Sequence, residues 1–521
     1  MYSIKRRQFM QGVAATPFLL NAPFALAANG ERPDFTVAVA ALPATLEPAR
    51  ELSNVGTRVT YSIFDTLIRR DFLGTPDGGG SELKPHLATS WERKSPSELI
   101  VTLRQGVKFH NGDELTSEDV AYTFRDGRLR GEKAQIPGGK PYFGILANVE
   151  AVDKYTVRFA TSVPDVLLEQ RLASWCAWIV NKRAYETMGF EAYSRAPVAT
   201  GPYKVVSHDQ SEATVLEAFD DYFLGTPTAK HVTFRAVPEL AARVAGLVSG
   251  EFDLITNIPP DQESVVGAYD DIDVRSVILA NAHVLCYDTR DPVLADKRVR
   301  QALSAAIDRQ KLVDTLWLGN AKVPGSHNYP EYGQMFVEGR KMAFDPEKSK
   351  ALLKEAGYNG QKITYRTQAG YYTNALEAAQ ILIEMWKAVG INAELQVVEG
   401  AGMRGPGSQI FNWSNSTRLP DPLGALWVAW GPAGEIQVGG FWDAASAKAF
   451  NDDGRALEAE TDPAKRKELF MKMLDQWEDE APGTILYQPS EAYAIKRSIS
   501  WRPTTFYFMD LRPDNLRFTQ S

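Results

Sequence analysis

Short apolar runs alternate with amphipathic stretches along most of the chain, and this pattern predicts a mixture of strands and helices. The runs 35–40 and 97–103 are rich in apolar and β-branched residues, which is typical of strands. The run from Val149 to Phe159 predicts a hairpin. Because strands alternate with capped helices, we expect an α/β or α+β protein.

Helix boundaries follow from capping residues. The stretch from Thr116 to Asp119 resembles a capping box, and the helix that it opens should run through Phe124. Two further helices are each expected to begin at an aspartate followed by proline, at 345–346 and 462–463, because aspartate is a good cap and proline is favoured at the first helical position. With these two, four further helices are expected over 238–248, 297–318, 346–357 and 463–483, and the second should be one long amphipathic helix.

The clearest local unit spans residues 362–398. A strand over 362–367, a helix over 374–389 and a strand over 391–398 predict a βαβ unit with a parallel strand pair. The next segment, Gly400 to Gly405, matches the pattern G-x-G-x-x-G of dinucleotide-binding sites. Such a site requires a helix to start there, but proline and glycine follow, so we interpret this segment as a loop.

Six aromatic residues gather between positions 411 and 442, among many Gly, Pro, Ser and Asn residues and without clear periodicity. They form either a small hydrophobic cluster under a long loop or the wall of a ligand cleft, and we favour the cleft for the region. The same segment holds polar groups of the kind that orient a ligand, namely Asn412, Asn415, Arg418 and Asp421. The aromatic residues are Phe411, Trp413, Trp427, Trp430, Phe441 and Trp442.

The N-terminal residues have the pattern of an export signal. A twin arginine, Arg6-Arg7, precedes a modestly apolar stretch that is too short to span a bilayer. Ala25-Leu26-Ala27 fits the small-x-small cleavage rule, so we expect a Tat-type signal peptide over 1–27. No cysteine follows that could carry a lipid anchor. We therefore expect a soluble protein in a bacterial periplasm.

The composition argues against several classes of function. The 521 residues carry 57 Lys and Arg against 65 Asp and Glu, a net charge of −8, so no basic excess is available for nucleic acid. The two cysteines, Cys176 and Cys286, are far apart, and we expect both to be free. The six histidines are scattered and no G-x-S-x-G motif occurs, so we predict no metal site, no cofactor and no catalytic residues.

Five motifs, in order along the chain, resemble those of the periplasmic solute-binding proteins of the peptide/nickel ABC-transporter family, family 5. The first reads Leu83-Lys-Pro-His-Leu-Ala-Thr-Ser-Trp91, and the second begins Leu103-Arg-Gln-Gly-Val-Lys-Phe-His-Asn-Gly112. Ala199 stands where the third motif usually has glycine. The motifs span 83–91, 103–124, 199–205, 243–253 and 298–308.

The resemblance implies an α/β fold of two lobes that close on a ligand about a hinge. It also implies binding without catalysis, delivery to permease subunits in the inner membrane, and a monomer. The first lobe would comprise 31–70, 195–284 and 487–521, with 71–194 as an inserted subdomain, and the second lobe would comprise 285–486.

One position departs from the peptide-binding members. In them a carboxylate a few residues before a proline pairs with the α-amino group of the ligand. When Asp421-Pro422 is aligned with the family pattern, Arg418 occupies that carboxylate position. An arginine would repel an ammonium group and hold a carboxylate or phosphate bidentately. Two alternatives stay open: Asp421 pairs with an amine in a shifted register, or Arg418 is a solvated residue paired with Asp421.

We therefore expect the substrate-binding protein of a bacterial ABC importer, with a small anionic or zwitterionic solute such as an opine-like or sugar-acid conjugate. One alternative is a di- or oligopeptide binder that recognises a free amine through Asp421. Another is a metal or metallophore binder, which would need His283 or His327 in the cleft. A hydrolase is disfavoured, because no nucleophile-base pair is evident. The predicted ligand-binding residues are Arg418, Trp413, Asn415, Asp421, Tyr371, Tyr372 and Trp430.

Overall fold

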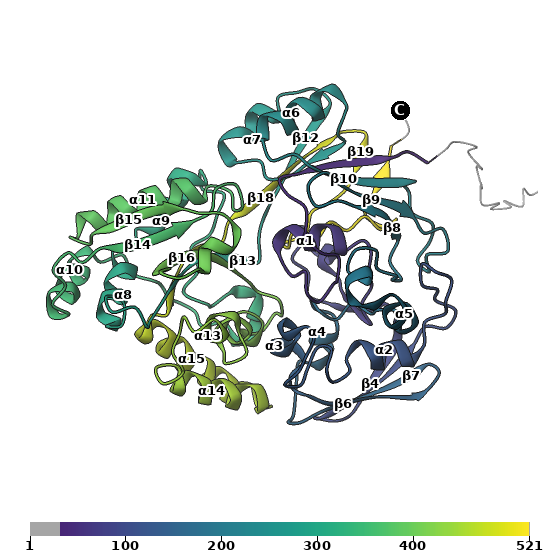
Figure 1. Ribbon diagram of the computed structural model, residues 1–521, viewed down its shortest axis with the longest axis horizontal. Coiled ribbons are helices and arrows are strands. Elements are labelled where there is room, and N and C mark those ends of the chain that lie inside the picture. Colours follow the sequence, from purple (N-terminus) through teal and green to yellow (C-terminus); the bar gives the residue numbers. More distant parts are fainter. Residues whose placement is uncertain (1–31, 520–521) are drawn as a thin grey trace, which may run out of the picture. The chain divides into compact units, whose positions relative to one another are not determined.

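A computed structural model of the protein describes residues 32–519 (Figure 1). The expected signal peptide, residues 1–27, lies outside the described residues. Within residues 32–519, no helix is both long and apolar enough to cross a membrane.

The first sheet has seven strands in the order β12-β18-β11-β1-β10-β9-β8. Strand β1 is parallel to both of its neighbours, β10 and β11, whereas β18 from near the C-terminus runs antiparallel to β11 and β12. Helices α6 (Leu240–Ser249) and α7 (Pro260–Val266) belong to this part, and α6 is the helix expected over 238–248, closed by Gly250 in the left-handed conformation. The strands are β1 Phe35–Val39, β8 Tyr203–His208, β9 Ala213–Ala218, β10 His231–Ala236, β11 Leu254–Ile255, β12 Ile272–Ile278 and β18 Ser490–Lys496.

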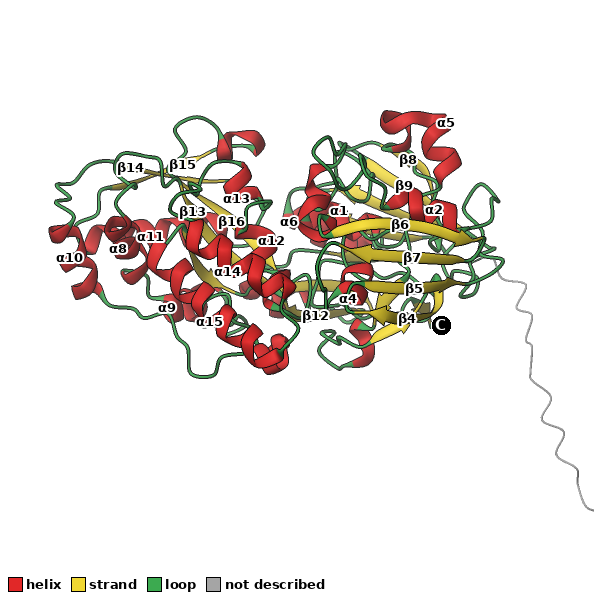
Figure 2. Cartoon of the chain, turned by 90° about the horizontal axis from the view of Figure 1, so that it is seen from below, coloured by secondary structure: helices red, strands yellow, loops and turns green. Residues whose placement is uncertain are grey.

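A second, four-stranded antiparallel sheet lies between β1 and β8 in the sequence, in the order β4-β5-β7-β6 (Figure 2). The predicted hairpin is confirmed as β6 and β7, and the capping box at Thr116 is present at the start of α2. The strands are β4 Ala88–Ser95, β5 Glu98–Leu103, β6 Leu146–Asp153 and β7 Thr156–Thr161. The helices of this region are α2 Ser117–Thr123, α3 Lys140–Phe143, α4 Leu168–Leu172 and α5 Lys182–Tyr193.

Three shorter elements complete this half of the chain. Helix α1 (Asn54–Thr60) follows β1, and Ser53 caps it by accepting a hydrogen bond from the Gly56 amide. The pairs β2 (Ile68–Arg70) with β3 (Leu83–Pro85) and β19 (Ile499–Ser500) with β20 (Arg517–Phe518) form two small antiparallel ribbons.

The five-stranded sheet has the order β15-β14-β16-β13-β17, and the predicted βαβ unit is confirmed as β14, α11 and the parallel strand β15. Strand β16 is also parallel to β14, so the carboxyl ends of three strands meet at one edge. The strands are β13 Asn281–Tyr287, β14 Ile363–Thr367, β15 Ala393–Val397, β16 Ile410–Ser416 and β17 Gly483–Tyr487. The helices are α8 Lys297–Ala305, α9 Arg309–Leu316, α10 Pro346–Glu355, α11 Ala375–Ala388, α12 Leu426–Trp430, α13 Glu435–Val438, α14 Lys448–Ala459 and α15 Pro463–Glu480.

The prediction of one helix over 297–318 is wrong. The segment forms α8 and α9, which are separated at Ala306 to Asp308. Asp308 acts as the N-cap of α9 by accepting a hydrogen bond from the Lys311 amide. A capping aspartate competes with helix continuation, because its side chain satisfies a backbone donor that a continuous helix would bond to a carbonyl. The predicted caps Asp345 and Asp462 are confirmed for α10 and α15.

Two short connections join the seven-stranded and five-stranded sheets. Only Leu279 and Ala280 separate β12 from β13, and only Gln488 and Pro489 separate β17 from β18. The connections are hydrogen bonded to each other, with the Leu279 amide 2.9 Å from the Pro489 carbonyl oxygen. Strand β13 begins at Asn281, so a lobe boundary at 284 would cut it. The lobe division remains our proposal, with this pair of connections as the hinge.

Candidate functional site

A cleft of about 810 Å³ has the volume of a small-molecule site. Three strands, β14, β15 and β16, direct their carboxyl ends toward it, which is where α/β sheets characteristically bind ligands. Its opposite wall comes from the loop before α1 and from the turn 135–138. The lining residues are Ala49 to Asn54, Gln135 to Gly138, Gln368, Tyr371, Tyr372, Gly400, Met403, Arg404, Asn412, Trp413, Ser414, Ser416, Arg418 and Glu435.

Alternation along β16 decides which of its polar residues face the cleft. Successive side chains of a strand point to opposite faces. Asn412, Ser414 and Ser416 line the cleft, and the Ser414 hydroxyl oxygen lies 3.1 Å from the Tyr372 hydroxyl oxygen. The Oδ1 atom of Asn412 is buried and has no hydrogen-bond partner among the described residues. This face of β16 therefore offers a ligand one unused acceptor, the Oδ1 atom of Asn412.

Arg418 lies just beyond the end of β16, held there by a tight turn. Its backbone amide donates to the Gly424 carbonyl oxygen at 3.2 Å. A side chain at Gly424 would meet the Leu419 backbone at 2.4 Å, so the turn requires glycine there. The guanidinium lies 5.0 Å from the ring centroid of Trp175 and 5.6 Å from that of Tyr142. No carboxylate among the described residues forms an ion pair with it, and its Nε atom is buried without a partner.

A second arginine in the cleft is neutralised. Arg404 forms an ion pair of 2.6 Å with Glu435 and lies over the Trp413 ring. The segment that carries it is the G-x-G-x-x-G match, a loop as predicted, with a single 3-10 turn over Gly400–Arg404. Arg366 holds this loop by donating to the carbonyl oxygens of Gly402, Gly405 and Pro406. The glycine pattern thus shapes one wall of the cleft and opens no long helix.

On the opposite wall, Glu51 is buried, with 8% of its surface exposed. Its carboxylate accepts hydrogen bonds from the amide and the hydroxyl group of Ser53. Burial raises the pKa of this carboxyl group. A side chain at Gly56 would meet the Glu51 Cγ at 2.0 Å, so glycine leaves the space that Glu51 occupies against α1. Tyr371, from the wall formed by the five-stranded sheet and its loops, lies against Ser53 and Asn54.

The cleft gathers Arg418, Trp413, Tyr371 and Tyr372 from the predicted set, but not the other three residues. Asn415 lies on the opposite face of β16, where its Nδ2 atom is 3.2 Å from the Ala425 carbonyl oxygen. Asp421 forms a buried ion pair of 2.8 Å with Arg466 and caps a turn through the Leu423 amide. Trp430 is fully buried against Trp477. Each of these three side chains has structural partners away from the cleft, which corrects their expected placement.

The aromatic segment is mostly core, which corrects the expectation of an aromatic-lined cleft. Five of its residues are buried in the hydrophobic core beside β13 and β16, and Trp413 alone lines the cleft. The five buried residues are Phe411, Trp427, Trp430, Phe441 and Trp442. Sequence reasoning missed Glu51, Arg404, Tyr142 and Trp175. Glu51, Tyr142 and Trp175 come from distant segments that no local pattern marks, whereas Arg404 lies in the G-x-G-x-x-G match, which we interpret only as a loop.

The described residues give no support to direct metal binding. His283 and His327 are buried and absent from the cleft lining, and burial lowers the pKa of each to about 3. Within 32–519, no three His, Cys, Asp or Glu side chains are placed to hold a metal ion. Cys176 and Cys286 are buried and free, as expected.

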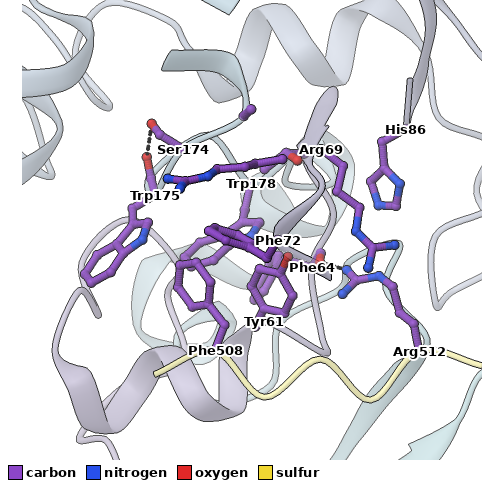
Figure 3. Close-up of a pocket in the computed structure, with 13 residues that line it drawn as sticks. Tyr61, Phe64, Arg69, Phe72, His86, Ser174, Trp175, Trp178, Phe508 and Arg512 are labelled. Carbon is purple, nitrogen blue, oxygen red and sulfur yellow. Dashed lines mark hydrogen bonds between the residues drawn. The ribbon is translucent and has the colours of Figure 1, made fainter. Parts of the chain in front are cut away.

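A second cavity, near the junction of α1 and β2, is too small for a solute (Figure 3). Its volume of about 20 Å³ admits one water molecule. Two of its three arginines, Arg69 and Arg512, are paired with Asp510, and Arg512 also lies 2.7 Å from Asp65. The third, Arg70, donates to the backbone carbonyl oxygens of residues 79 and 80. The large cleft is therefore the candidate ligand site.

Residues 82–437 match the model of the bacterial extracellular solute-binding proteins, family 5 Middle. The chain belongs to this family. A family 5 chain of this kind is the substrate-binding component of an ABC importer, and family members are periplasmic or extracellular. The fold is the two-lobed α/β fold of family 5 binding proteins.

Among curated relatives, the glutathione-binding protein GsiB of Pectobacterium atrosepticum is 27% identical over 505 residues, which cover 93% of this chain and 92% of GsiB. The oligopeptide-binding protein AppA of Bacillus subtilis is 25% identical over 438 residues, 77% of each chain. Among solved structures, the binding protein MoaA of A. tumefaciens R10, in complex with mannopinic acid, has a TM-score of 0.80 at 22% identity, covering 94% of this chain and 100% of MoaA. This last likeness concerns the fold alone.

Proposed function

We propose that this protein captures a small solute with an anionic group in the cleft between β16 and α1 and delivers it to the permease of its importer. The anionic group would bind Arg418, and Trp413 would stack on an apolar or sugar face of the solute. Capture would take place in the periplasm after export, by a monomer and without catalysis. Closure about the hinge would couple binding to recognition by the permease.

The observation that carries the proposal is the unpaired state of Arg418 inside the cleft. Arg404, the other arginine on the same wall of the cleft, already forms an ion pair with Glu435. Arg418 instead lies beside two aromatic rings, and its Nε atom has no acceptor in the part of the chain that the structure describes. A buried donor without a partner costs about 1–3 kcal/mol, more when it is charged, and an anionic ligand would recover that cost. A planar guanidinium matches the two oxygens of a carboxylate.

An ordinary peptide binder that uses Asp421 is the second candidate, because the names of AppA and GsiB indicate peptide ligands. The Asp421 carboxylate is already bound to Arg466 and to the Leu423 amide, which disfavours this role. Glutathione itself carries two carboxylates, so a ligand of that kind suits Arg418 as well.

Ligand-induced stabilisation tests the proposal. Refolded protein free of bound solute should show a rise in Tm with mannopinic acid or glutathione, because a ligand that binds only the native state stabilises it. Arg418→Gln should weaken binding about 10- to 100-fold, since a charge-assisted bidentate contact is lost. Calorimetric titration measures the loss. Arg418→Lys serves as the control, since it keeps the positive charge but loses the planar guanidinium that binds two oxygens. Its affinity should lie between those of the wild type and Arg418→Gln.

The opposite result is also specific. Peptides that bind equally well to the Arg418→Gln variant, but not after acetylation of their amino groups, would return the protein to the ordinary peptide binders.

A further inference from the structure

We infer that Glu51 recognises a cationic group of the ligand, so that the cleft selects solutes with an acidic group at one end and a protonated amine or guanidinium at the other. The inference rests on the proposed function, because it assigns the second pole of the same site.

Glu51 is placed as a recognition residue would be. It is more than nine-tenths buried, it lines the cleft, and only its Oε1 atom accepts hydrogen bonds, both from Ser53. No cation among the described residues forms an ion pair with it. The adjacent Arg50 directs its guanidinium over the Phe190 ring, 5.3 Å from the centroid. The Oε2 atom of Glu51 is therefore free to accept from a ligand.

A buried carboxylate without a cation is unusual, because desolvation penalises the charge. The other buried acids near α1 have such partners. Glu491 lies 2.7 Å from Arg58, and Glu47 is paired with Arg128. Burial raises the pKa of Glu51, and its two bonds to Ser53 and the charge of nearby Arg50 offset this only in part. A ligand cation would supply the missing partner, and Tyr371 beside it would add an aromatic surface.

Apart from Arg50, whose guanidinium lies over the Phe190 ring, the charges of the cleft that lack an ion pair among the described residues form two poles on opposite walls. Glu51 belongs to the loop before α1, and Arg418 follows β16 in the five-stranded sheet. In the same cleft, Arg404 and Glu435 neutralise each other as an ion pair. A zwitterion that contacts both walls satisfies both poles, whereas a simple anion leaves Glu51 buried and unpaired. The ligand class is thus an amino acid derivative or conjugate that retains its amine, and not a sugar acid alone.

The test uses three probes: mannopinic acid, glutathione and the dipeptide alanylalanine. Each is titrated by calorimetry in its natural form and with its amine acetylated. We expect acetylation to weaken binding about 10- to 100-fold, and Glu51→Gln to weaken the natural form to a similar degree. In Glu51→Gln, the natural and the acetylated form of each probe should bind with equal affinity. The Tm of the ligand-free variant should be unchanged or higher, because a desolvated charge has been removed while the contacts with Ser53 can persist.

Glu435→Gln is the matched control, since it removes a carboxylate of the same cleft that already has a cation. In Glu435→Gln, acetylation of the ligand's amine should still weaken binding as it does in the wild type. Binding that depends on Arg418 but is indifferent to Glu51→Gln and to acetylation would overturn this inference and leave the proposed function standing. Failure of every probe to bind, or binding indifferent to Arg418→Gln, would overturn both.

Discussion

At the residue scale, the partner of a charge decides its role. Asp421 and Arg418 are three positions apart in one loop, yet they have opposite surroundings. Asp421 is buried against Arg466, which also donates to the Leu457 carbonyl oxygen. Arg418 has no carboxylate partner among the residues described and faces the cleft. The first is therefore expected to contribute to stability and the second to binding.

Asp421→Ala should lower the free energy of unfolding by about 3–5 kcal/mol, because it leaves the Arg466 charge buried without a partner. Urea denaturation measures this change. Asp421→Asn, which can still accept from the Leu423 amide, should cost less. A variant that keeps its stability but loses affinity for free amines would show instead that Asp421 is a ligand anchor.

At the element scale, strand β16 places two asparagines on opposite faces. The Oδ1 atoms of both are without a hydrogen-bond partner among the described residues, but Asn412 faces the cleft, whereas the Nδ2 atom of Asn415 bonds to His327 and the Ala425 carbonyl oxygen on the other face. Asn415→Ala should cost about 1–3 kcal/mol of stability by leaving buried polar atoms unpaired. Asn412→Ala should leave the free protein as stable as the wild type and weaken ligand binding. Paired denaturation and titration of the two variants compare the faces, and equal effects on stability would contradict this assignment.

The break between α8 and α9 depends on one cap. Asp308→Ala should lower stability by about 0.5–2 kcal/mol, because the Lys311 amide loses its acceptor. Asp308→Ser retains a capping oxygen and should recover most of the loss. Urea unfolding of both variants is the measurement. An alanine variant as stable as the wild type would mean that the packing of α9, and not the cap, sets its start.

Local signals could be predicted from the sequence, and distant contacts could not. The capping box at Thr116 and the βαβ unit at 362–398 each depend on residues close in sequence, and both were predicted correctly. The strand over 410–416 was not predicted, because polar residues occupy both of its faces, so Asn412 and Asn415 could not be told apart. The role of Glu51 depends on a wall that lies some 360 positions away in the chain, as the contact of Asn54 with Ser414 shows.

At the scale of the whole molecule, buried histidines couple stability to pH. Burial lowers the pKa of His110 to about 4 and that of His283 and His327 to about 3, whereas an unfolded histidine titrates near 6.5. Between these values the unfolded chain binds more protons, so stability rises with pH. The free energy of unfolding should therefore fall as the pH is lowered from 6.5 to 5, by up to about 1.4 kcal/mol per pH unit for each histidine.

Urea denaturation across this range measures the slope. His283→Phe is the informative variant, because the His283 ring forms no hydrogen bond with the residues that the structure describes and packs among Tyr372, Trp317 and Tyr487. Its slope should be shallower than that of the wild type. An unchanged slope would show that this histidine is not the source of the proton uptake.

The position of β18 governs the order in which the chain can fold during synthesis. Residues 490–496 insert between β11 and β12, which the ribosome has released more than 200 residues earlier. Until β18 arrives, β12 has no neighbour in its sheet. The five-stranded sheet, in contrast, takes all its strands from 281–487 and can close first. From the synthesis of β12 until that of β18, the nascent protein therefore carries an incomplete seven-stranded sheet whose unpaired strand edges are exposed to aggregation.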